Sequence, residues 1–361
     1  MPTKYKTDDL RICATKEVIP PVRVHQEIPI SEAAAHTTLQ ARQAVHDILV
    51  GKDDRLLVVV GPCSIHDTQA AHEYAKLLKV IKDELQDDLL IVMRVYFEKP
   101  RTTVGWKGLI NDPDLDASFN INKGLRIARQ LLVDLNASGM PAATEYLDLI
   151  TPQYVSDLIA WGAVGARTTE SQVHRELASG LSCPVGFKNA TDGSVKIAID
   201  AMGAAMSPHH FLSLTKAGHS AIFSTTGNED VHIILRGGHD RPNYDAVSVD
   251  HVGQEMQKAG LRANIMIDLS HANSLKQCQR QILVGEDVAE QIAGGDQRIM
   301  GVMVESHLKA GNQSVVEGQP LVYGQSITDA CLSWDDTIPL LKKFALAVQQ
   351  RRAIVRKSGV K

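Results

Sequence analysis

The sequence has few of the residues that would cross-link a small secreted protein or carry it into a membrane. Its five cysteines are odd in number and share no repeated spacing, so neither a disulfide framework nor a CxxC metal site is predicted. No apolar run approaches the ~20 residues of a membrane helix. The polar, charged segment 1–11 is unlike a signal peptide. We therefore expect a cytoplasmic protein with reduced thiols and no membrane partner.

The sequence also lacks a strong excess of charge of either sign. Its formal net charge is −4, whereas a nucleic-acid-binding protein usually carries a basic surface, so no nucleic-acid partner is predicted. Hydrophobic residues make up 44% of the chain and charged residues 22%, which is typical of a globular protein. Its 361 residues would suit two domains, but closed α/β barrels often exceed the usual domain length as one unit.

The chain does have a repeated alternation of short apolar runs with amphipathic stretches. The runs predict eight buried strands, at residues 56–60, 90–95, 141–144, 163–166, 184–187, 231–235, 264–268 and 299–304. The stretches between them predict helices at 68–85, 120–138, 152–161, 193–205, 246–259 and 274–293. Such alternation is typical of a parallel sheet covered by helices. Eight units predict a (β/α)8 TIM barrel, with a doubly wound sheet as the alternative.

Two segments depart from this alternation. Residues 1–50 form a predicted N-terminal extension, which ends in an amphipathic helix from its N-cap Ser31 to Val50. Within the barrel of residues 51–361, an insertion at about 208–228 holds two short apolar runs on either side of Gly218. The insertion therefore predicts a β-hairpin rather than a barrel strand.

Ionisable residues follow all eight predicted strands, where a TIM barrel carries its chemistry. Four of them are cations, namely Arg94, Arg167, Lys188 and Arg236. Four cations on one rim repel one another unless an anion neutralises them, and arginine suits phosphate and carboxylate groups. The pattern predicts one ligand with both groups, or two ligands with several anionic charges.

A second set of strand-end residues offers metal ligands. They are Cys63, His271 and Glu305, with Asp329 available after the eighth strand. Thiolate, imidazole and carboxylate groups together suit a borderline transition metal. A buried cysteine alone is more often a small hydrophobic residue of the core, and lone histidines are commonly structural. The prediction therefore depends on all four residues meeting at one barrel mouth.

Seven short segments at the strand ends form a recognisable series, which is GPCSIH (61–66), RVYFEKPRTT (94–103), GARTTE (165–170), PVGFKN (184–189), LRGG (235–238), DLSHAN (268–273) and VES (304–306). In this order they resemble the 3-deoxy-D-arabino-heptulosonate 7-phosphate (DAHP) synthases, and most of all the feedback-regulated class of enteric bacteria and yeasts. The resemblance runs from about residue 50 to 340, and a weaker one covers the extension.

The resemblance implies an enzyme that joins phosphoenolpyruvate to D-erythrose 4-phosphate and releases phosphate, in the first step of the shikimate pathway. It implies that phosphoenolpyruvate is bound by Arg94, Arg167, Lys188 and Arg236. It implies an erythrose 4-phosphate loop made of Lys99, Pro100, Arg101 and Thr102. It also implies one divalent metal ion per subunit (Mn, Fe, Co or Zn), held by Cys63, His271, Glu305 and Asp329.

Two residues are predicted to move protons in this reaction. Lys99 is a candidate to protonate the alkoxide that forms at the aldehyde oxygen. Glu145 is a candidate to position or deprotonate the water that adds to phosphoenolpyruvate. Cys331 lies two residues after Asp329, so it is predicted to approach Cys63 once the metal leaves, and oxidation of this pair is predicted to inactivate the metal-free enzyme.

The extension and the hairpin imply, through the same resemblance, an effector site away from the barrel mouth. The matching residues are Asp8, Asp9, Leu149, Pro152, Gln153, Leu177, Leu181, Ser182, Phe211, Ser213 and Phe223. Ser213 favours phenylalanine as the inhibitor, with tyrosine as the alternative, and the tryptophan-sensitive type can share this serine. A hairpin that only stabilises an oligomer is the other interpretation.

The resemblance further implies a homo-oligomer, and we expect a tetramer in preference to a dimer. Two other functions stay open. One is a 3-deoxy-octulosonate 8-phosphate synthase, against which the loop at 99–102 and the extension both argue. The other is an amino-acid-sensing relative without catalysis, whose signature would be a missing metal ligand or phosphate-binding cation, and neither is missing from the sequence.

Overall fold

Eight parallel strands close into a barrel in the computed structural model, which describes residues 5–101, 105–316 and 318–358. The strand order around the barrel is β1-β10-β9-β8-β5-β4-β3-β2. The strands are β1 (Leu56–Gly61), β2 (Leu89–Arg94), β3 (Ala142–Glu145), β4 (Ile159–Val164), β5 (Val185–Lys188), β8 (Val231–Leu235), β9 (Ile265–Asp268) and β10 (Ile299–Glu305). The predicted (β/α)8 barrel is therefore confirmed, and the doubly wound sheet is wrong.

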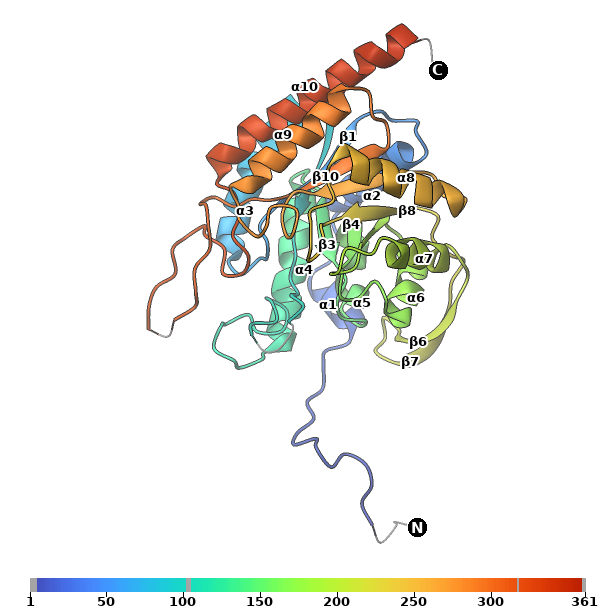
Figure 1. Ribbon diagram of the computed structural model, residues 1–361. Helices are drawn as coiled ribbons and strands as arrows, with labels where there is room; N and C mark the ends of the chain where they lie inside the picture. Colours follow the sequence, from blue (N-terminus) through green and yellow to red (C-terminus); the bar gives the residue numbers. More distant parts are fainter. Residues whose placement is uncertain (1–4, 102–104, 317, 359–361) are drawn as a thin grey trace.

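Helices surround the barrel and connect its strands (Figure 1). They are α1 (Pro21–Glu27), α2 (Glu32–Leu49), α3 (Thr68–Glu84), α4 (Ile121–Ala137), α5 (Pro152–Val155), α6 (Gln172–Gly180), α7 (Lys196–Ala205), α8 (Ala246–Lys258), α9 (Arg280–Ala293) and α10 (Trp334–Ser358). In α3, Tyr74, Leu78 and Ile81 repeat at helical spacing and are buried. The Asp67 side chain caps its first turn by accepting from the Gln69 and Ala70 amides.

Helix α2 closes the end of the barrel at which the strands begin. Its buried side chains, including Val45 and Ile48, belong to the same apolar cluster as strand residues such as Leu57 and Met300. Arg42 of α2 donates to the Ile159 carbonyl at the start of β4, at 2.9 Å. The last helix of the extension is therefore part of the barrel core, and the other end of the barrel stays open for a site.

A two-stranded antiparallel sheet, β6 (His210–Leu214) and β7 (Ser220–Ser224), lies outside the barrel. This is the predicted hairpin, inserted between α7 and β8. Ser179 of α6 and Thr225 hydrogen-bond through their hydroxyls at 2.7 Å. The Lys216 carbonyl in the turn accepts from the Val22 amide of α1 at 2.7 Å. The hairpin is thus anchored on α6 at its base and on the extension at its tip.

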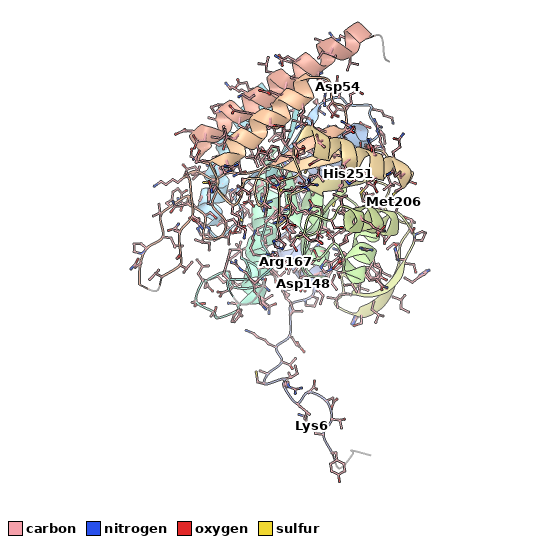
Figure 2. All side chains as sticks on the ribbon, in the orientation of Figure 1. Lys6, Asp54, Asp148, Arg167, Met206 and His251 are labelled. Carbon is pink, nitrogen blue, oxygen red and sulfur yellow. The ribbon has the colours of Figure 1, made fainter. Side chains whose placement is uncertain are left out.

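The extension before α1 runs away from the barrel (Figure 1). Figure 2 labels Lys6 far from the rest of the molecule, and the neighbouring Asp8 and Asp9 are exposed. These two predicted effector residues therefore do not meet the hairpin of their own chain. No helix in the described part of the chain combines the length and apolar character that a membrane crossing requires.

Several predicted boundaries were wrong. The fourth strand spans Ile159–Val164, not 163–166, and the predicted helix 152–161 is only the short α5 followed by a 3-10 turn at Ser156–Leu158. Helices α7 and α9 begin at Lys196 and Arg280, later than predicted, while α1 and α6 were not predicted at all. A short apolar run fits a buried strand and a buried helix equally well, which explains the error before β4.

Candidate active site

The carboxyl ends of the barrel strands surround a cavity of about 370 Å³. Eight predicted site residues line it, and they are Lys99, Pro100, Glu145, Arg167, Lys188, Arg236, His271 and Asp329. They follow seven different strands, so residues far apart in the sequence meet because the barrel closes. Cys63, Arg94 and Glu305 are not part of the lining and are fully buried.

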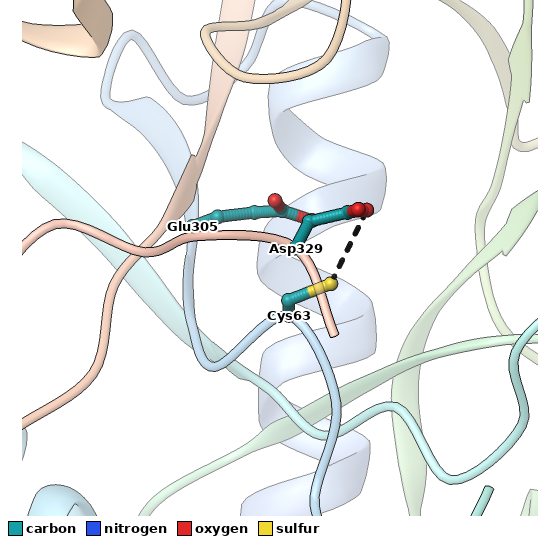
Figure 3. A group of neighbouring side chains, drawn as sticks. All are labelled: Cys63, Glu305 and Asp329. Carbon is teal, nitrogen blue, oxygen red and sulfur yellow. Dashed lines mark hydrogen bonds between the residues drawn. The ribbon is translucent and has the colours of Figure 1, made fainter. Parts of the chain in front are cut away.

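Three of the four predicted metal ligands form one compact group (Figure 3). The Cys63 Sγ, one carboxylate oxygen of Glu305 and one of Asp329 all lie within 4.8 Å of one another. The Cys63 thiol donates to Asp329 Oδ2 at 3.6 Å. Glu305 Oε1 is buried and makes no hydrogen bond with the described residues. A buried carboxylate oxygen that lies at ion-pair distance from Arg94 but accepts no hydrogen bond, beside a thiol and a second carboxylate, fits a cation-binding site.

His271 stands at the edge of this group. Its Nε2 is 3.9 Å from Glu305 Oε1, and its Nδ1 is 2.9 Å from Asp268 Oδ2. The His271 backbone has φ 55°, a left-handed conformation that non-glycine residues adopt mainly where surrounding structure enforces it. A carboxylate that engages Nδ1 leaves Nε2 as the atom available to a metal.

Burial strongly affects the Cys63 thiol. Burial and the carboxylates of Glu305 and Asp329 together outweigh Lys99 and Arg94 and raise the pKa of Cys63 to about 11. The thiol is therefore protonated at neutral pH unless a cation binds beside it. Since a thiolate is the form that ligates a metal, metal binding here is coupled to loss of the Cys63 proton.

Arg94 is held rigidly below the cavity. Its guanidinium donates to the carbonyls of Pro62 at 3.1 Å and Cys63 at 3.2 Å, and it lies 3.0 Å from Glu305 Oε1. The Tyr96 ring lies against it, with Cζ 3.6 Å from the ring centroid. Arg94 thus connects the predicted metal group to the predicted phosphoenolpyruvate cations.

Asp268 connects the same two groups by a second route. It is fully buried, and its Oδ2 lies 3.1 Å from Lys188 Nζ as well as 2.9 Å from His271 Nδ1. Both contacts have ion-pair distances but not hydrogen-bond angles. Burial raises the pKa of this carboxyl, yet His271 and Lys188 outweigh burial and hold it well below its usual range. Asp268 was not among the predicted site residues, although its position three residues before His271 was an available signal.

Lys99 reaches into the metal group from the loop after β2. Its Nζ donates to the Cys63 Sγ at 3.1 Å and to the Cys63 carbonyl at 3.3 Å. Burial lowers the pKa of Lys99, but the neighbouring Cys63, Glu305 and Asp329 outweigh that effect and raise it overall. Lys99 is therefore a buried cation that can donate a proton inside the cavity.

Glu145 lines the cavity and packs against Gly165. Any other residue at position 165 would displace the Glu145 carboxylate. A Cβ atom at Gly165 would lie 2.3 Å from Glu145 Oε1. The side chain of Glu145 is 7% exposed, while Arg167 on the following loop is exposed. The GARTTE segment after β4 therefore makes room for a carboxylate and places a cation beside it.

The predicted erythrose 4-phosphate loop is only partly described. Pro100 lines the cavity, but the Arg101 Nε donates to the Trp106 carbonyl at 2.8 Å instead of pointing into the cavity. Thr102 lies outside the described residues. Lys276 lines the cavity from the loop after β9 and was not predicted.

The remaining predicted effector residues gather around the hairpin, α5 and α6. Phe211 and Phe223 are cross-strand partners whose ring centroids are 6.1 Å apart, on the partly buried face that also carries Ser213. The hairpin residue Lys216 donates to the Gln153 carbonyl. Leu177, near the end of α6, is buried. Leu181 and Ser182 follow α6, and Leu149 and Pro152 lie at α5.

The comparisons with known proteins agree with the strand-end chemistry. The model of the DAHP synthetase I family matches residues 27–342. The chain belongs to the DAHP synthetase I family. It is 65% identical to the Phe-sensitive phospho-2-dehydro-3-deoxyheptonate aldolase of Escherichia coli (strain K12), across 96% of this chain and 99% of that one. It is 54% identical to the Trp-sensitive enzyme of Enterobacter agglomerans, with the same two coverages.

The structure agrees with this family as well. A solved phospho-2-dehydro-3-deoxyheptonate aldolase from Francisella tularensis SCHU S4 superposes with a TM-score of 0.93 at 55% identity, covering 94% of this chain and 99% of that chain. The predicted membership of the DAHP synthases, and with it the transferase function in aromatic amino acid biosynthesis, is confirmed. DAHP synthases are generally metal-dependent, which suits the group of Cys63, Glu305 and Asp329.

Proposed function

We propose that this DAHP synthase condenses phosphoenolpyruvate with D-erythrose 4-phosphate and water, and releases inorganic phosphate. The observation that supports this most directly is the meeting of a metal-type donor group with converging cations at one barrel mouth. The C3 carbon of phosphoenolpyruvate attacks the aldehyde carbon, water adds at C2, and the C2–O bond to phosphate breaks as the hemiketal phosphate collapses.

We propose Cys63, His271, Glu305 and Asp329 as the ligands of one divalent metal per subunit. Their mixed sulfur, nitrogen and oxygen atoms suit iron, manganese, cobalt or zinc. When bound, the metal supplies a Lewis acid for the aldehyde oxygen. The unsatisfied Glu305 Oε1 and the orientation of His271 by Asp268 both support this ligand set.

The four cations are proposed to bind phosphoenolpyruvate. Lys188 and Arg236 line the cavity with Arg167, and Arg94 lies below them against Glu305. Their charge compensates the phosphate and carboxylate groups before and during the reaction, and being fixed in place they need little reorganisation. Pro100, Arg101 and Thr102 are proposed to bind erythrose 4-phosphate together with Lys99, and Arg101 would have to leave the Trp106 carbonyl to do so.

Two residues are proposed to handle protons. Lys99 is buried, cationic and inside the cavity, so it can donate a proton to the oxygen that becomes an alkoxide. Glu145 lies on the same cavity and can orient or deprotonate water at C2. Lys99 follows β2 and Glu145 ends the neighbouring strand β3, so both residues lie on one side of the barrel mouth.

Activity on both substrates with and without a chelator tests this function. We expect phosphate release from phosphoenolpyruvate with erythrose 4-phosphate, its loss after chelation and its recovery on adding a divalent metal. A parallel assay offers arabinose 5-phosphate, which a 3-deoxy-octulosonate 8-phosphate synthase would prefer. Absence of turnover with either sugar phosphate in metal-loaded protein would favour a non-catalytic amino-acid-sensing relative.

We also propose that phenylalanine inhibits the enzyme at the hairpin. Phe211, Ser213 and Phe223 share one face of the hairpin, and the Thr151 hydroxyl donates at 3.0 Å to Glu98, the residue before Lys99. This hydrogen bond gives a direct path from the effector region to the active-site loop. The segment before α1, which carries the exposed Asp8 and Asp9, runs away from the barrel (Figure 1), so these residues are proposed to complete the effector site of another subunit.

Replacing Ser213 with glycine is expected to weaken phenylalanine inhibition and leave uninhibited turnover unchanged, because the hairpin lies away from the cavity. The measurement is the inhibition curve for phenylalanine, tyrosine and tryptophan with parent and variant. Ser224→Gly, on the exposed face of the neighbouring strand, is the matched control and should keep the parent response. If no aromatic amino acid inhibits the parent, the effector site does not exist.

A homo-oligomer, with a tetramer favoured over a dimer, is the proposed assembly. Leu212 and Ile222 are cross-strand partners on the outer face of the hairpin and are 81% and 73% exposed. We expect Leu212→Glu to shift the oligomer toward smaller species in analytical ultracentrifugation, because it puts a charge into an apolar contact. Leu39→Glu alters a leucine of α2 that is 66% exposed and serves as the control. An unchanged distribution for Leu212→Glu would place the interface elsewhere.

We propose a cytoplasmic location. All five cysteines are free, and Cys63, Cys183 and Cys331 are buried as thiols. The Cys63 amide donates to the Cys331 Sγ at 3.4 Å, which supports the proposal that this pair is open to oxidation once the metal leaves. A reducing compartment would keep Cys63 available as a ligand.

A further inference from the structure

A second cavity lies at the opposite end of the barrel from the active site. Its volume is about 200 Å³, and it is lined by residues just before β1, β9 and β10 together with the end of α2 and the last turns of α10. Figure 2 labels Asp54 beside the C-terminal half of α10, well away from Arg167 at the catalytic end. This end of a TIM barrel ordinarily serves stability, so its charges should be paired within the protein.

The charges around this cavity do not balance. Its lining contains two aspartates, Asp53 and Asp54, and five arginines, namely Arg55, Arg262, Arg351, Arg352 and Arg356. Both aspartates are already engaged, because Arg55 lies 2.6 Å from Asp53 and Arg352 lies 2.6 Å from Asp54. The other three arginines have no carboxylate within 4.0 Å among the described residues; Arg262 and Arg356 are exposed to solvent, whereas Arg351 is buried.

Arg351 is the cation whose position is hardest to explain by stability alone. It is only 7% exposed, and its guanidinium donates to the carbonyls of Ile299 at 3.3 Å and Asp54 at 2.5 Å. Burial, helped by the neighbouring Arg352, lowers the pKa of Arg351 and outweighs Asp54 and Asp296, which raise it. An arginine has five N–H donors, and these two hydrogen bonds to carbonyls leave other donors of Arg351 available to a ligand.

Arg262, an exposed residue, lines the same cavity and packs against a glycine. Gly51 has φ +76°, and a Cβ atom there would lie 2.2 Å from Arg262 Nη2, so the guanidinium lies directly against the backbone that ends α2. A cation at a helix C-terminus interacts favourably with the helix dipole, which explains part of this placement. It does not explain why a second unpaired guanidinium, that of Arg351, lines the same cavity.

We propose that this cavity binds a phosphate group, either as inorganic phosphate or as part of a small phosphomonoester. The arginine fork matches the geometry of phosphate oxygens, and a dianion would offset most of the excess positive charge. Buried Ile48 and Met300 form an apolar wall that suits the carbon part of an ester. The site is separate from both the catalytic mouth and the hairpin.

A crystal soak with tungstate, a heavy analogue of phosphate, locates the site directly. The crystals hold the metal-loaded enzyme with phosphoenolpyruvate, so that the catalytic cations are occupied. We expect an anomalous peak between Arg262 and Arg351. Absence of a peak there overturns the proposal, whatever is bound at the catalytic mouth.

Binding in solution separates a real site from a response to crystal concentrations. With phosphoenolpyruvate saturating, inorganic phosphate should raise the melting temperature of the parent to a plateau, and the concentration dependence gives an apparent affinity for phosphate. Arg262→Gln should weaken this affinity about tenfold, because a hydrogen bond to a charged group is lost. Lys196→Gln removes an exposed cation elsewhere, with a side chain 80% exposed, and should match the parent. Equal responses in Arg262→Gln and the parent overturn the proposal, as does a tungstate peak without saturable binding.

Phenyl phosphate is the second ligand in the same assay. Tighter binding than inorganic phosphate supports a phosphomonoester that uses the wall of Ile48 and Met300, and equal binding supports free phosphate. Turnover of Arg262→Gln should equal that of the parent when no phosphate is added, because Arg262 lies at the far end of the barrel. Arg262→Lys, which keeps the charge but not the fork, should fall between the parent and the glutamine variant.

Discussion

Replacing Lys99 with methionine is expected to lower kcat by about 10²- to 10⁴-fold, the usual contribution of a general acid. Methionine fills a similar volume but cannot donate a proton to the developing alkoxide. Because Lys99 also touches the Cys63 sulfur at 3.1 Å, the metal content of the variant must be measured and brought to saturation first. The measurement is then kcat alongside the dissociation constant of phosphoenolpyruvate, which should change far less.

Two further variants distinguish proton donation from general loss of charge. Lys99→Arg keeps the cation but raises the pKa of the donor and alters its reach, so its kcat should recover only in part. Lys107→Met, at an exposed lysine of the same loop, should behave like the parent. Unchanged turnover in metal-saturated Lys99→Met would remove Lys99 from the chemistry.

Replacing Asp268 with asparagine is expected to weaken metal affinity by about 10- to 100-fold, the usual cost of losing the partner of a ligating histidine. Asparagine keeps the shape, and its Oδ1 can still accept from the Ser270 amide, but it removes the negative charge that faces His271 and Lys188. Asp268 is thus a positioning residue. The readout is the metal dissociation constant, measured by competition with a chelator of known affinity.

The control for Asp268 is another buried aspartate away from the site. Asp112 is 6% exposed and accepts from the Ala117 amide, so Asp112→Asn tests whether losing a buried charge in itself affects metal binding. Metal affinity should be unchanged in that variant. If Asp268→Asn also binds metal like the parent, His271 is held by its strained backbone alone.

The sequence predicted the barrel because its strands are buried on both faces and read as unbroken apolar runs. Five of the eight strand positions depended on runs with several β-branched residues, such as Leu56–Gly61. The error around β4 has a specific cause. The apolar run there begins directly after the 3-10 turn at Ser156–Leu158, and its Gly162 and Ala163 belong to residue types that are depleted in strands.

The site was predictable in its residue types but not in its geometry. Cys63, Glu305 and Asp329 were found because they follow strands or resemble family motifs, and the structure groups them. Pattern alone could not show that His271 adopts a left-handed backbone, or that Asp268 bridges it to Lys188, because both depend on how one loop folds after β9. The arginines at the far end of the barrel were missed for a similar reason, since they belong to no local motif.

The separate sheet formed by β6 and β7 has an evolutionary consequence. The two strands hydrogen-bond to each other and to no barrel strand, so a substitution such as one at Ser213 leaves the register of the catalytic barrel untouched. The proposed effector site and the catalytic barrel can therefore diverge at different rates within one gene. Independent change of these two parts would produce relatives that keep one reaction but respond to different amino acids. The relatives named Phe-sensitive and Trp-sensitive, at 65% and 54% identity to this chain, fit that expectation.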